Sequence, residues 1–181
     1  MLHAVIMAGG SGTRFWPLSR QARPKQCLAL GTPEPLIIET SKRLTPLIGF
    51  ENQYIVAGRK LEKPFETLFQ GWKADQFIWE PCARNTAPCI GLASLLLAAE
   101  DPEAILVVLP SDHHIAEPEK FRAAIEAAQQ RAARGELVTL GIRPTRAETG
   151  YGYIELNQTL NADNQHLAVK QFVEKPNRQL A

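Results

Sequence analysis

The sequence is poor in cysteine and has no excess of charge of either sign. It contains three cysteines, Cys27, Cys82 and Cys89, and no C-x-x-C pair. This count argues against a zinc site or a disulfide framework, and reduced thiols favour a cytoplasmic protein. Lys and Arg total 20 against 19 Asp and Glu, for a net charge of +1. That balance argues against a protein that binds nucleic acid through a generally basic surface.

Long apolar runs are also missing. The longest one, residues 90–99, is interrupted by Gly91 and Ser94 and is too short to span a bilayer, so no membrane contact is expected. No signal-peptide pattern precedes the first predicted strand. With 45% hydrophobic and 22% charged residues, the chain has the composition of a folded globular protein. Its length suits one domain, residues 1–181, and we find no internal repeat or linker.

A glycine-rich stretch near the N-terminus is the feature around which the chain is organised. A short apolar run, residues 3–7, predicts a buried strand directly before it. Three glycines then fall within four positions: Gly9, Gly10 and Gly12. Glycine permits positive φ and close approach of the backbone, so that several N–H groups can converge on an anion. Hydroxyl and basic side chains follow, namely Ser11, Thr13, Arg14 and Lys25. The combination suits a polyphosphate.

Two familiar phosphate-binding loops are excluded by their spacing. A Walker A loop requires a second glycine followed directly by Lys and then Ser or Thr, and no segment matches. A dinucleotide fingerprint that starts at Gly10 would need glycine where this sequence has Phe15. Glycines alone also occur in ordinary strand-to-helix turns, and that interpretation stays open on the glycines alone.

Alternating apolar patterns predict the fold class. Strands are expected at residues 3–7, 54–58, 77–79, 104–109, 137–142, 151–156 and 167–173, and helices at residues 36–47, 61–69, 84–99 and 118–134. This alternation predicts an α/β fold with a mostly parallel sheet and helices on both faces. The unbroken aliphatic run at 104–109 predicts a central strand.

Polar residues directly after these strands predict a crevice at one edge of the sheet. The glycine stretch, Glu80 and Asp112 each follow a predicted strand. Ligands of parallel sheets bind beyond the carboxyl ends of the strands, so we expect the three segments to meet there. A carboxylate such as Asp112 is a suitable ligand for Mg²⁺ that also contacts substrate phosphates. An Asp at this place also commonly forms a turn, and the adjacent His113 and His114 lack partners at metal-ligand spacing.

Glu80 offers a way to choose a nucleobase. Its carboxylate can accept hydrogen bonds from both N1–H and the 2-amino group of guanine, and Arg84 and Asn85 follow in the same segment. The alternative is a surface ion pair between Glu80 and Arg84, worth at most about 1 kcal/mol. Two later segments also carry polar and aromatic residues. On spacing alone, residues 148–153 are better explained as a tight turn into a strand, and residues 172–176 as an ordinary strand end.

The full set of motifs resembles the sugar-1-phosphate nucleotidylyltransferase family. The resemblance is carried along the whole chain by seven segments: residues 9–14, 16–19, 24–26, 80–88, 109–113, 148–153 and 172–176. It is greatest to the mannose-1-phosphate guanylyltransferase branch, which includes forms fused to a mannose-6-phosphate isomerase. Cys27 departs from the pattern, which has Phe at that position.

The resemblance implies a fold and an activity. The fold is a Rossmann-like, three-layer α/β/α nucleotidyltransferase domain, incomplete at its C-terminal end. The activity is transfer of GMP from GTP to α-D-mannose 1-phosphate, giving GDP-mannose for polysaccharide biosynthesis, with pyrophosphate as the second product and Mg²⁺ as cofactor. A homo-oligomer is compatible with it. Two alternatives stay open: another hexose 1-phosphate or nucleoside triphosphate, or a regulatory subunit that binds sugar nucleotide without turnover.

The resemblance also implies the roles of individual residues. Arg14, Lys25 and Lys175 are expected to be catalytic, and Asp112 to bind the metal ion. The nucleotide is expected to contact Gly9, Gly10, Ser11, Gly12, Thr13, Arg14, Glu80, Arg84 and Asn85. The sugar phosphate is expected to contact Gly150, Tyr151, Glu174 and Lys175. A second metal-binding aspartate is expected downstream of Pro176, and residues 177–181 are not acidic. Residues 1–181 alone are therefore expected to catalyse the reaction slowly.

Overall fold

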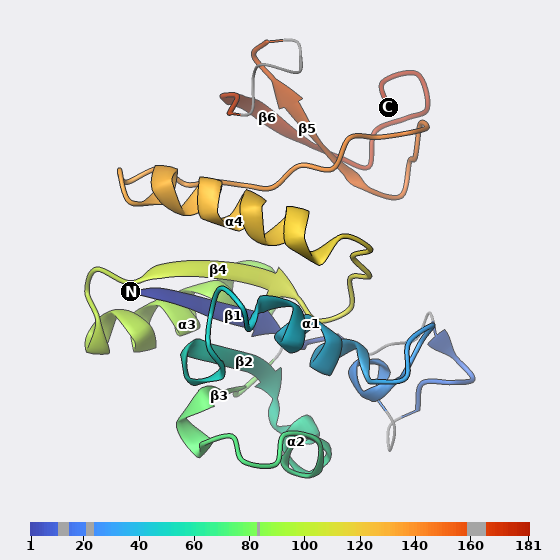
Figure 1. Ribbon diagram of the computed structural model, residues 1–181. Helices are drawn as coiled ribbons and strands as arrows, with labels where there is room; N and C mark the ends of the chain where they lie inside the picture. Colours follow the sequence, from blue (N-terminus) through green and yellow to red (C-terminus); the bar gives the residue numbers. More distant parts are fainter. Residues whose placement is uncertain (11–14, 21–23, 83, 159–165) are drawn as a thin grey trace. The chain divides into compact units, whose positions relative to one another are not determined.

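The computed structural model describes residues 1–10, 15–20, 24–82, 84–158 and 166–181 (Figure 1). These residues form two compact units, Met1–Val138 and Thr139–Ala181. Each unit has its own secondary structure and is described by itself.

The first unit is built on a four-stranded parallel sheet. Its strands are β1 (Leu2–Met7), β2 (Gln53–Gly58), β3 (Phe77–Glu80) and β4 (Ile105–Pro110), in the order β3-β2-β1-β4. All three pairings are parallel, and Ile6 of β1 lies opposite Ile55 and Leu109. The four strands predicted in this part of the sequence are therefore confirmed.

Helices lie between successive strands of this sheet and after its last strand, as the sequence predicts. They are α1 (Leu36–Leu44), α2 (Glu62–Leu68), α3 (Thr86–Glu100) and α4 (Pro118–Ala132). Short 3₁₀ turns occur at Lys25–Cys27, Phe50–Asn52, Arg59–Leu61 and Ala74–Gln76. No helix in the described part of the chain has the length and apolar character needed to cross a membrane.

The sheet is the middle of three layers. Ala4 and Ile6 of β1 belong to a buried cluster with side chains of α1, α2 and α4. Val5, between them in sequence, belongs to a second cluster with Cys89, Ala93 and Leu97 of α3. Successive side chains of a strand point to opposite faces, so helices cover both sides of the sheet (Figure 1). The three-layer α/β/α fold is confirmed for this unit.

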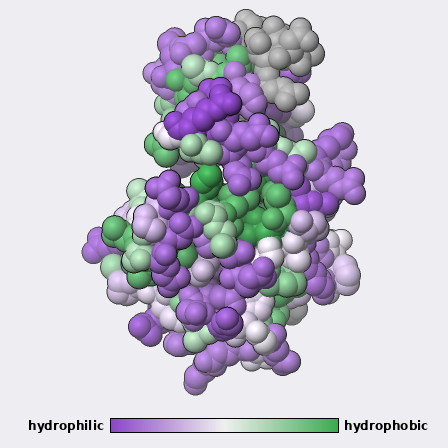
Figure 2. Space-filling view, turned by 60° about the vertical axis from the view of Figure 1, so that its left-hand side comes forward, coloured by the Kyte–Doolittle hydropathy of each residue, from purple (hydrophilic) through white to green (hydrophobic). Residues whose placement is uncertain are grey.

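The strand at 104–109 is not a central one, which corrects the sequence-based expectation. β4 lies at the edge of the described sheet, and five of its six side chains are only partly buried. An aliphatic run indicates that a strand is apolar but does not identify its neighbours, so it cannot distinguish a centre from an edge. Figure 2 shows apolar residues on the surface of the molecule. Among the exposed apolar side chains are Leu95 and Leu96 of α3, which are 74% and 49% exposed.

The second unit contains an antiparallel pair of strands. β5 (Gly152–Leu156) pairs with β6 (Val169–Glu174), and Gly152 lies opposite Glu174. The strands predicted at 151–156 and 167–173 are confirmed.

The prediction of a strand at residues 137–142 is wrong. The segment has no regular secondary structure, and Leu137 and Ile142 are 106% and 88% exposed. A strand forms when a neighbouring strand pairs with its backbone, and this segment pairs with none of the described strands. It crosses the boundary between the two units. Apolar composition alone therefore misled the prediction.

The three cysteines differ in burial, and this predicts their reactivity. Cys82 is exposed, Cys27 is intermediate and Cys89 is buried. Burial, with a smaller contribution from Glu80, raises the pKa of the Cys89 thiol to about 11. Burial also raises the pKa of Cys27. Thiolates are the reactive form. We expect a thiol reagent at pH 8 to modify Cys82 first and Cys89 only on unfolding, as mass spectrometry of digested protein would show.

The C82S substitution provides the control for this experiment. It should remove the fast phase of modification without changing the slow one. Fast modification of Cys89 in the folded protein would contradict the burial described here.

Candidate functional site

The carboxyl ends of the parallel strands bring several predicted site residues to one edge of the sheet. β1 ends at Met7 and is followed by Gly9, while β3 ends at Glu80. A Cβ atom placed on Gly9 would lie 3.9 Å from Oε2 of Glu80, so the glycine backbone passes close to this carboxylate. Glu80 is only 8% exposed. The start of the glycine stretch and the proposed base-reading carboxylate are thus neighbours.

A short ion pair joins two other predicted residues at this edge. Nζ of Lys25 donates to Oδ2 of Asp112 at 2.5 Å, across 87 residues of sequence. Their side chains are 19% and 24% exposed. Gly10 has a φ of +100°, and a Cβ there would lie 3.9 Å from Cε of Lys25. The positive φ therefore favours glycine at position 10, and the lysine side chain lies in ordinary contact distance of this position. A cation and an anion are thus held beside the glycine stretch.

Gln26 fixes the beginning of the glycine stretch from inside the protein. Its side chain is fully buried, and Nε2 donates to the carbonyl oxygens of Ala8 at 2.7 Å and Gly9 at 3.0 Å. These two bonds set the orientation of the peptide groups that lead into the turn. Sequence reasoning included Gln26 in a motif but missed this contact, because nothing local indicates that its amide is buried.

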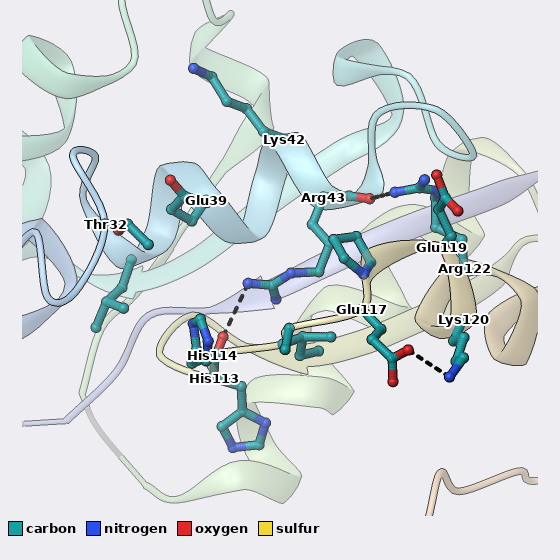
Figure 3. Close-up of a pocket in the computed structure, with 14 residues that line it drawn as sticks. Thr32, Glu39, Lys42, Arg43, His113, His114, Glu117, Glu119, Lys120 and Arg122 are labelled. Atoms are coloured by element: carbon teal, nitrogen blue, oxygen red, sulfur yellow. Dashed lines mark hydrogen bonds and ion pairs between the residues drawn. The ribbon is translucent and has the colours of Figure 1, made fainter.

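Helix α1 holds the segment that carries Asp112. Oγ1 of Thr40 donates to the carbonyl oxygen of Ser111 at 3.4 Å, and Nη2 of Arg43 donates to that of His113 at 3.2 Å (Figure 3). The amide of Ser111 also donates to the carbonyl of Met7 at 3.1 Å. Sequence reasoning missed Thr40 and Arg43, since polar residues on an amphipathic helix usually face solvent. The only signal was their occurrence three residues apart on one face.

A pocket of about 580 Å³ lies beside this segment, between α1 and the start of α4 (Figure 3). Arg43 and the exposed His113 and His114 contribute to its lining. Burial lowers the pKa of the Arg43 guanidinium, with Glu39 acting in the opposite direction. Across the described ranges, no three His, Cys, Asp or Glu side chains form a metal-binding group.

The donor set at Asp112 suits Mg²⁺ rather than a transition metal. Its carboxylate is a hard oxygen ligand, partly exposed at a strand end, and already holds a cation, Nζ of Lys25. Mg²⁺ commonly takes one or two carboxylates and completes its shell with phosphate oxygens and water. The residues present therefore fit the ion through Asp112.

The remaining predicted nucleotide-binding residues are only partly placed. Arg84 and Asn85 are exposed directly before α3, where Asn85 has a φ of 67° and makes no side-chain cap. Among the described residues, Glu80 and Arg84 form no ion pair, so the surface-pair alternative is not seen. Four predicted residues lie outside the described ones: Ser11, Gly12, Thr13 and Arg14.

The residues predicted to contact the sugar lie together in the second unit. The amide of Lys175 donates to the carbonyl of Tyr151 at 3.1 Å, which extends the pairing of β5 with β6. The ammonium group of Lys175 lies 3.4 Å from Oε1 of Glu174, and Tyr151 is 68% exposed. The amide of Gly150 donates to Oε1 of Glu148 at 3.2 Å. This unit thus presents a cation, a carboxylate and an aromatic ring in one exposed cluster.

Comparison with known proteins identifies the family. The nucleotidyl transferase family model matches residues 3–181. The chain belongs to this family. This nucleotidyl transferase resembles a mannose-1-phosphate guanylyltransferase of Salmonella typhimurium, with 44% identity over 175 residues, covering 95% of this chain and 36% of that protein. It is 41% identical to the xanthan biosynthesis protein XanB of Xanthomonas campestris, with 95% and 36% coverage.

A solved structure supports the same conclusion. The crystal structure of a mannose-1-phosphate geranyltransferase from Thermus thermophilus matches with a TM-score of 0.87 and 36% identity, over 99% of this chain and 51% of that one. This nucleotidyl transferase chain spans 36% of the length of the curated relatives named above.

Proposed function

We propose that this nucleotidyl transferase transfers GMP from GTP to α-D-mannose 1-phosphate, giving GDP-mannose and pyrophosphate. The observation that carries the proposal is the 44% identity to a relative named mannose-1-phosphate guanylyltransferase, over 95% of this chain. The chain covers 36% of that relative's length, so the relative's activity is a proposal for this chain. The resemblance to a xanthan biosynthesis protein supports a role in polysaccharide synthesis. The free cysteines support a cytoplasmic site.

The proposed reaction is a single in-line displacement. An oxygen of the mannose phosphate bonds to the α-phosphorus of GTP, and the bond between the α-phosphorus and its bridging oxygen breaks. Pyrophosphate leaves with that oxygen and its charge. Two anions must approach each other, so catalysis consists mainly of positioning and of electrostatic stabilisation by fixed donors.

The first unit supplies groups for the triphosphate. The backbone N–H groups at Gly9 and Gly10 would donate to phosphate oxygens at close range. Gln26 sets the orientation of this backbone. Lys25 would donate to phosphate oxygens near the reacting centre, and we propose the same for Arg14. Asp112 would hold Mg²⁺, which neutralises phosphate charge when bound. In this proposal the ion pair between Lys25 and Asp112 breaks when substrate binds, because each residue then takes a different partner.

The second unit supplies groups for the sugar phosphate. Lys175 would neutralise the attacking phosphate, and Glu174 would accept hydrogen bonds from sugar hydroxyls. Tyr151 is exposed and can stack on the sugar ring, while Gly150 allows close approach. The backbone hydrogen bond from the amide of Lys175 to the carbonyl of Tyr151 supports a shared role, because it holds the two residues at the same end of the β5–β6 pair.

Glu80 is proposed to read guanine, which predicts a change in base selectivity. E80Q replaces one carboxylate oxygen by a donor that faces the 2-amino group. The preference for GTP over ITP, which lacks that group, should narrow about tenfold, the value of one charged hydrogen bond. Calorimetric titration of both nucleotides measures this. E66Q, an exposed position on α2, is the matched control. An equal loss of affinity for both nucleotides would mean that Glu80 is structural.

A product assay tests the proposed function itself. The protein is incubated with each nucleoside triphosphate and each of mannose, glucose and galactose 1-phosphates, and products are identified by mass spectrometry. GDP-mannose should dominate. A different sugar nucleotide would establish another substrate pair, and nucleotide binding without any product would favour the regulatory alternative.

A further inference from the structure

Helix α1 contacts the backbone on both sides of Asp112. Thr40 donates to the carbonyl of Ser111, and Arg43 donates to the carbonyl of His113, at 3.4 and 3.2 Å. Position 40 is fully buried and position 43 is 9% exposed. The two donors lie almost one turn apart on the helix, and they reach the residues directly before and after the carboxylate.

Two other contacts hold the segment that carries Asp112: the Ser111 amide donates to the carbonyl of Met7, and Lys25 pairs with the Asp112 carboxylate. β4 ends at Pro110 and α4 begins at Pro118, so the segment between them lies outside any strand or helix. The Ser111 amide bond to Met7 ties down its first residue only. Beyond Asp112, among the described contacts of residues 113–116, the bond from Arg43 is the hydrogen bond that links them to another element. A pocket, rather than packed side chains, lies next to them.

Burying a guanidinium costs free energy unless the group is paired and hydrogen-bonded. Nη1 of Arg43 is buried and has no hydrogen-bond partner among the described residues. Arg43 makes its described side-chain hydrogen bond through Nη2, to a backbone carbonyl rather than to a carboxylate. In turn, Nη1 of Arg122 on α4 donates to the carbonyl of Arg43 at 3.0 Å. An alkyl side chain of similar length would pack here without the desolvation cost.

We propose that Arg43, assisted by Thr40, is a positioning residue that orients Asp112 toward the metal ion. The inference rests on the proposed function, in which Asp112 is the metal ligand. Metal affinity depends on ligand orientation, and removing the groups that orient a ligand typically weakens metal binding about 10- to 100-fold. Arg43 acts through the backbone of the segment and does not itself contact substrate.

The test measures metal binding directly. Mn²⁺ replaces Mg²⁺, and the Mn²⁺ bound to the protein is measured by electron paramagnetic resonance in titrations with saturating GTP, whose phosphates complete the metal's coordination shell, with GTP alone as the blank. R43M should weaken Mn²⁺ binding about tenfold, while R43K, which can still donate one bond, should recover part of it. K42M removes a neighbouring cation whose partner is Glu34 and which does not bond the segment, so it should bind Mn²⁺ as the wild type does.

Two further variants separate the possible failures. D112N should abolish the binding that R43M weakens; if D112N binds Mn²⁺ normally, the metal assignment of the proposed function and this inference both fail. If D112N loses Mn²⁺ while a folded R43M binds it normally, only the role of Arg43 is overturned. Should R43M not fold, T40V against T40S decides: weaker binding in T40V alone supports the inference, and equal binding in both overturns it.

Discussion

Replacement of Lys25 by methionine is expected to lower the rate of pyrophosphate release about 10²- to 10³-fold. The size corresponds to losing one preorganised donor at the reacting phosphates, roughly 2.7–4 kcal/mol of transition-state stabilisation. Lys25 lies beside Gly10 and pairs with Asp112, so its ammonium group is already at the strand ends before substrate enters. Methionine keeps most of the length of the side chain and removes the ammonium group, with its charge and its hydrogen-bond donors. The rate with saturating GTP and mannose 1-phosphate is the measurement.

Metal affinity distinguishes this catalytic role from general damage to the site, because K25M should lower the rate without weakening metal binding. K25M frees Asp112 from its ion pair, so Mn²⁺ binding without nucleotide should be at least as tight as in the wild type. K63M, at an exposed position on α2, is the matched control and should keep the wild-type rate. A wild-type rate in K25M with an unchanged melting temperature would refute the catalytic role of Lys25.

Replacement of Phe65 by alanine is expected to lower the free energy of unfolding by about 3–5 kcal/mol. Phe65 is 0% exposed and belongs to the cluster on the face of the sheet covered by α1, α2 and α4. Its ring centroid lies 5.6 Å from that of Phe69 and 6.4 Å from that of Trp79. Helix α2 has 7 residues, too few to be stable without packing, so the cavity would also loosen the helix. Urea denaturation followed by tryptophan fluorescence measures the loss.

L95A on α3 is the comparison for this experiment. Leu95 is also apolar and helical but is 74% exposed, so its truncation should change stability by no more than about 0.5 kcal/mol. Equal effects of F65A and L95A would show that the buried cluster is not the source of stability in this unit.

Much of the architecture follows from local pattern. Aliphatic runs such as residues 105–109 predicted the four strands of the first unit, and apolar spacing in α1 and α4, together with the Ala and Leu content of α3, predicted its α-helices. The parallel arrangement then follows from the alternation of strands and helices. Since parallel strands end at one edge, the meeting of Gly9 with Glu80, and the position of Asp112, could be predicted in outline. The roles of individual residues came from the resemblance to a family, and they stay predictions.

Other features depended on contacts between distant residues. The pattern of residues 137–142 is that of a strand, yet no described strand pairs with it. The edge position of β4 is a property of the sheet and not of its own sequence.

The sequence by itself determined where the four strands and four α-helices of the first unit form, because the apolar pattern of each of these segments is a local property. Only the tertiary structure decided that Lys25 pairs with Asp112, that Gln26 is buried beneath the glycine stretch, and that Arg43 reaches the segment after β4. The physical reason is that a polar side chain has no preferred partner until the fold brings a charge or a carbonyl oxygen within about 3 Å of it.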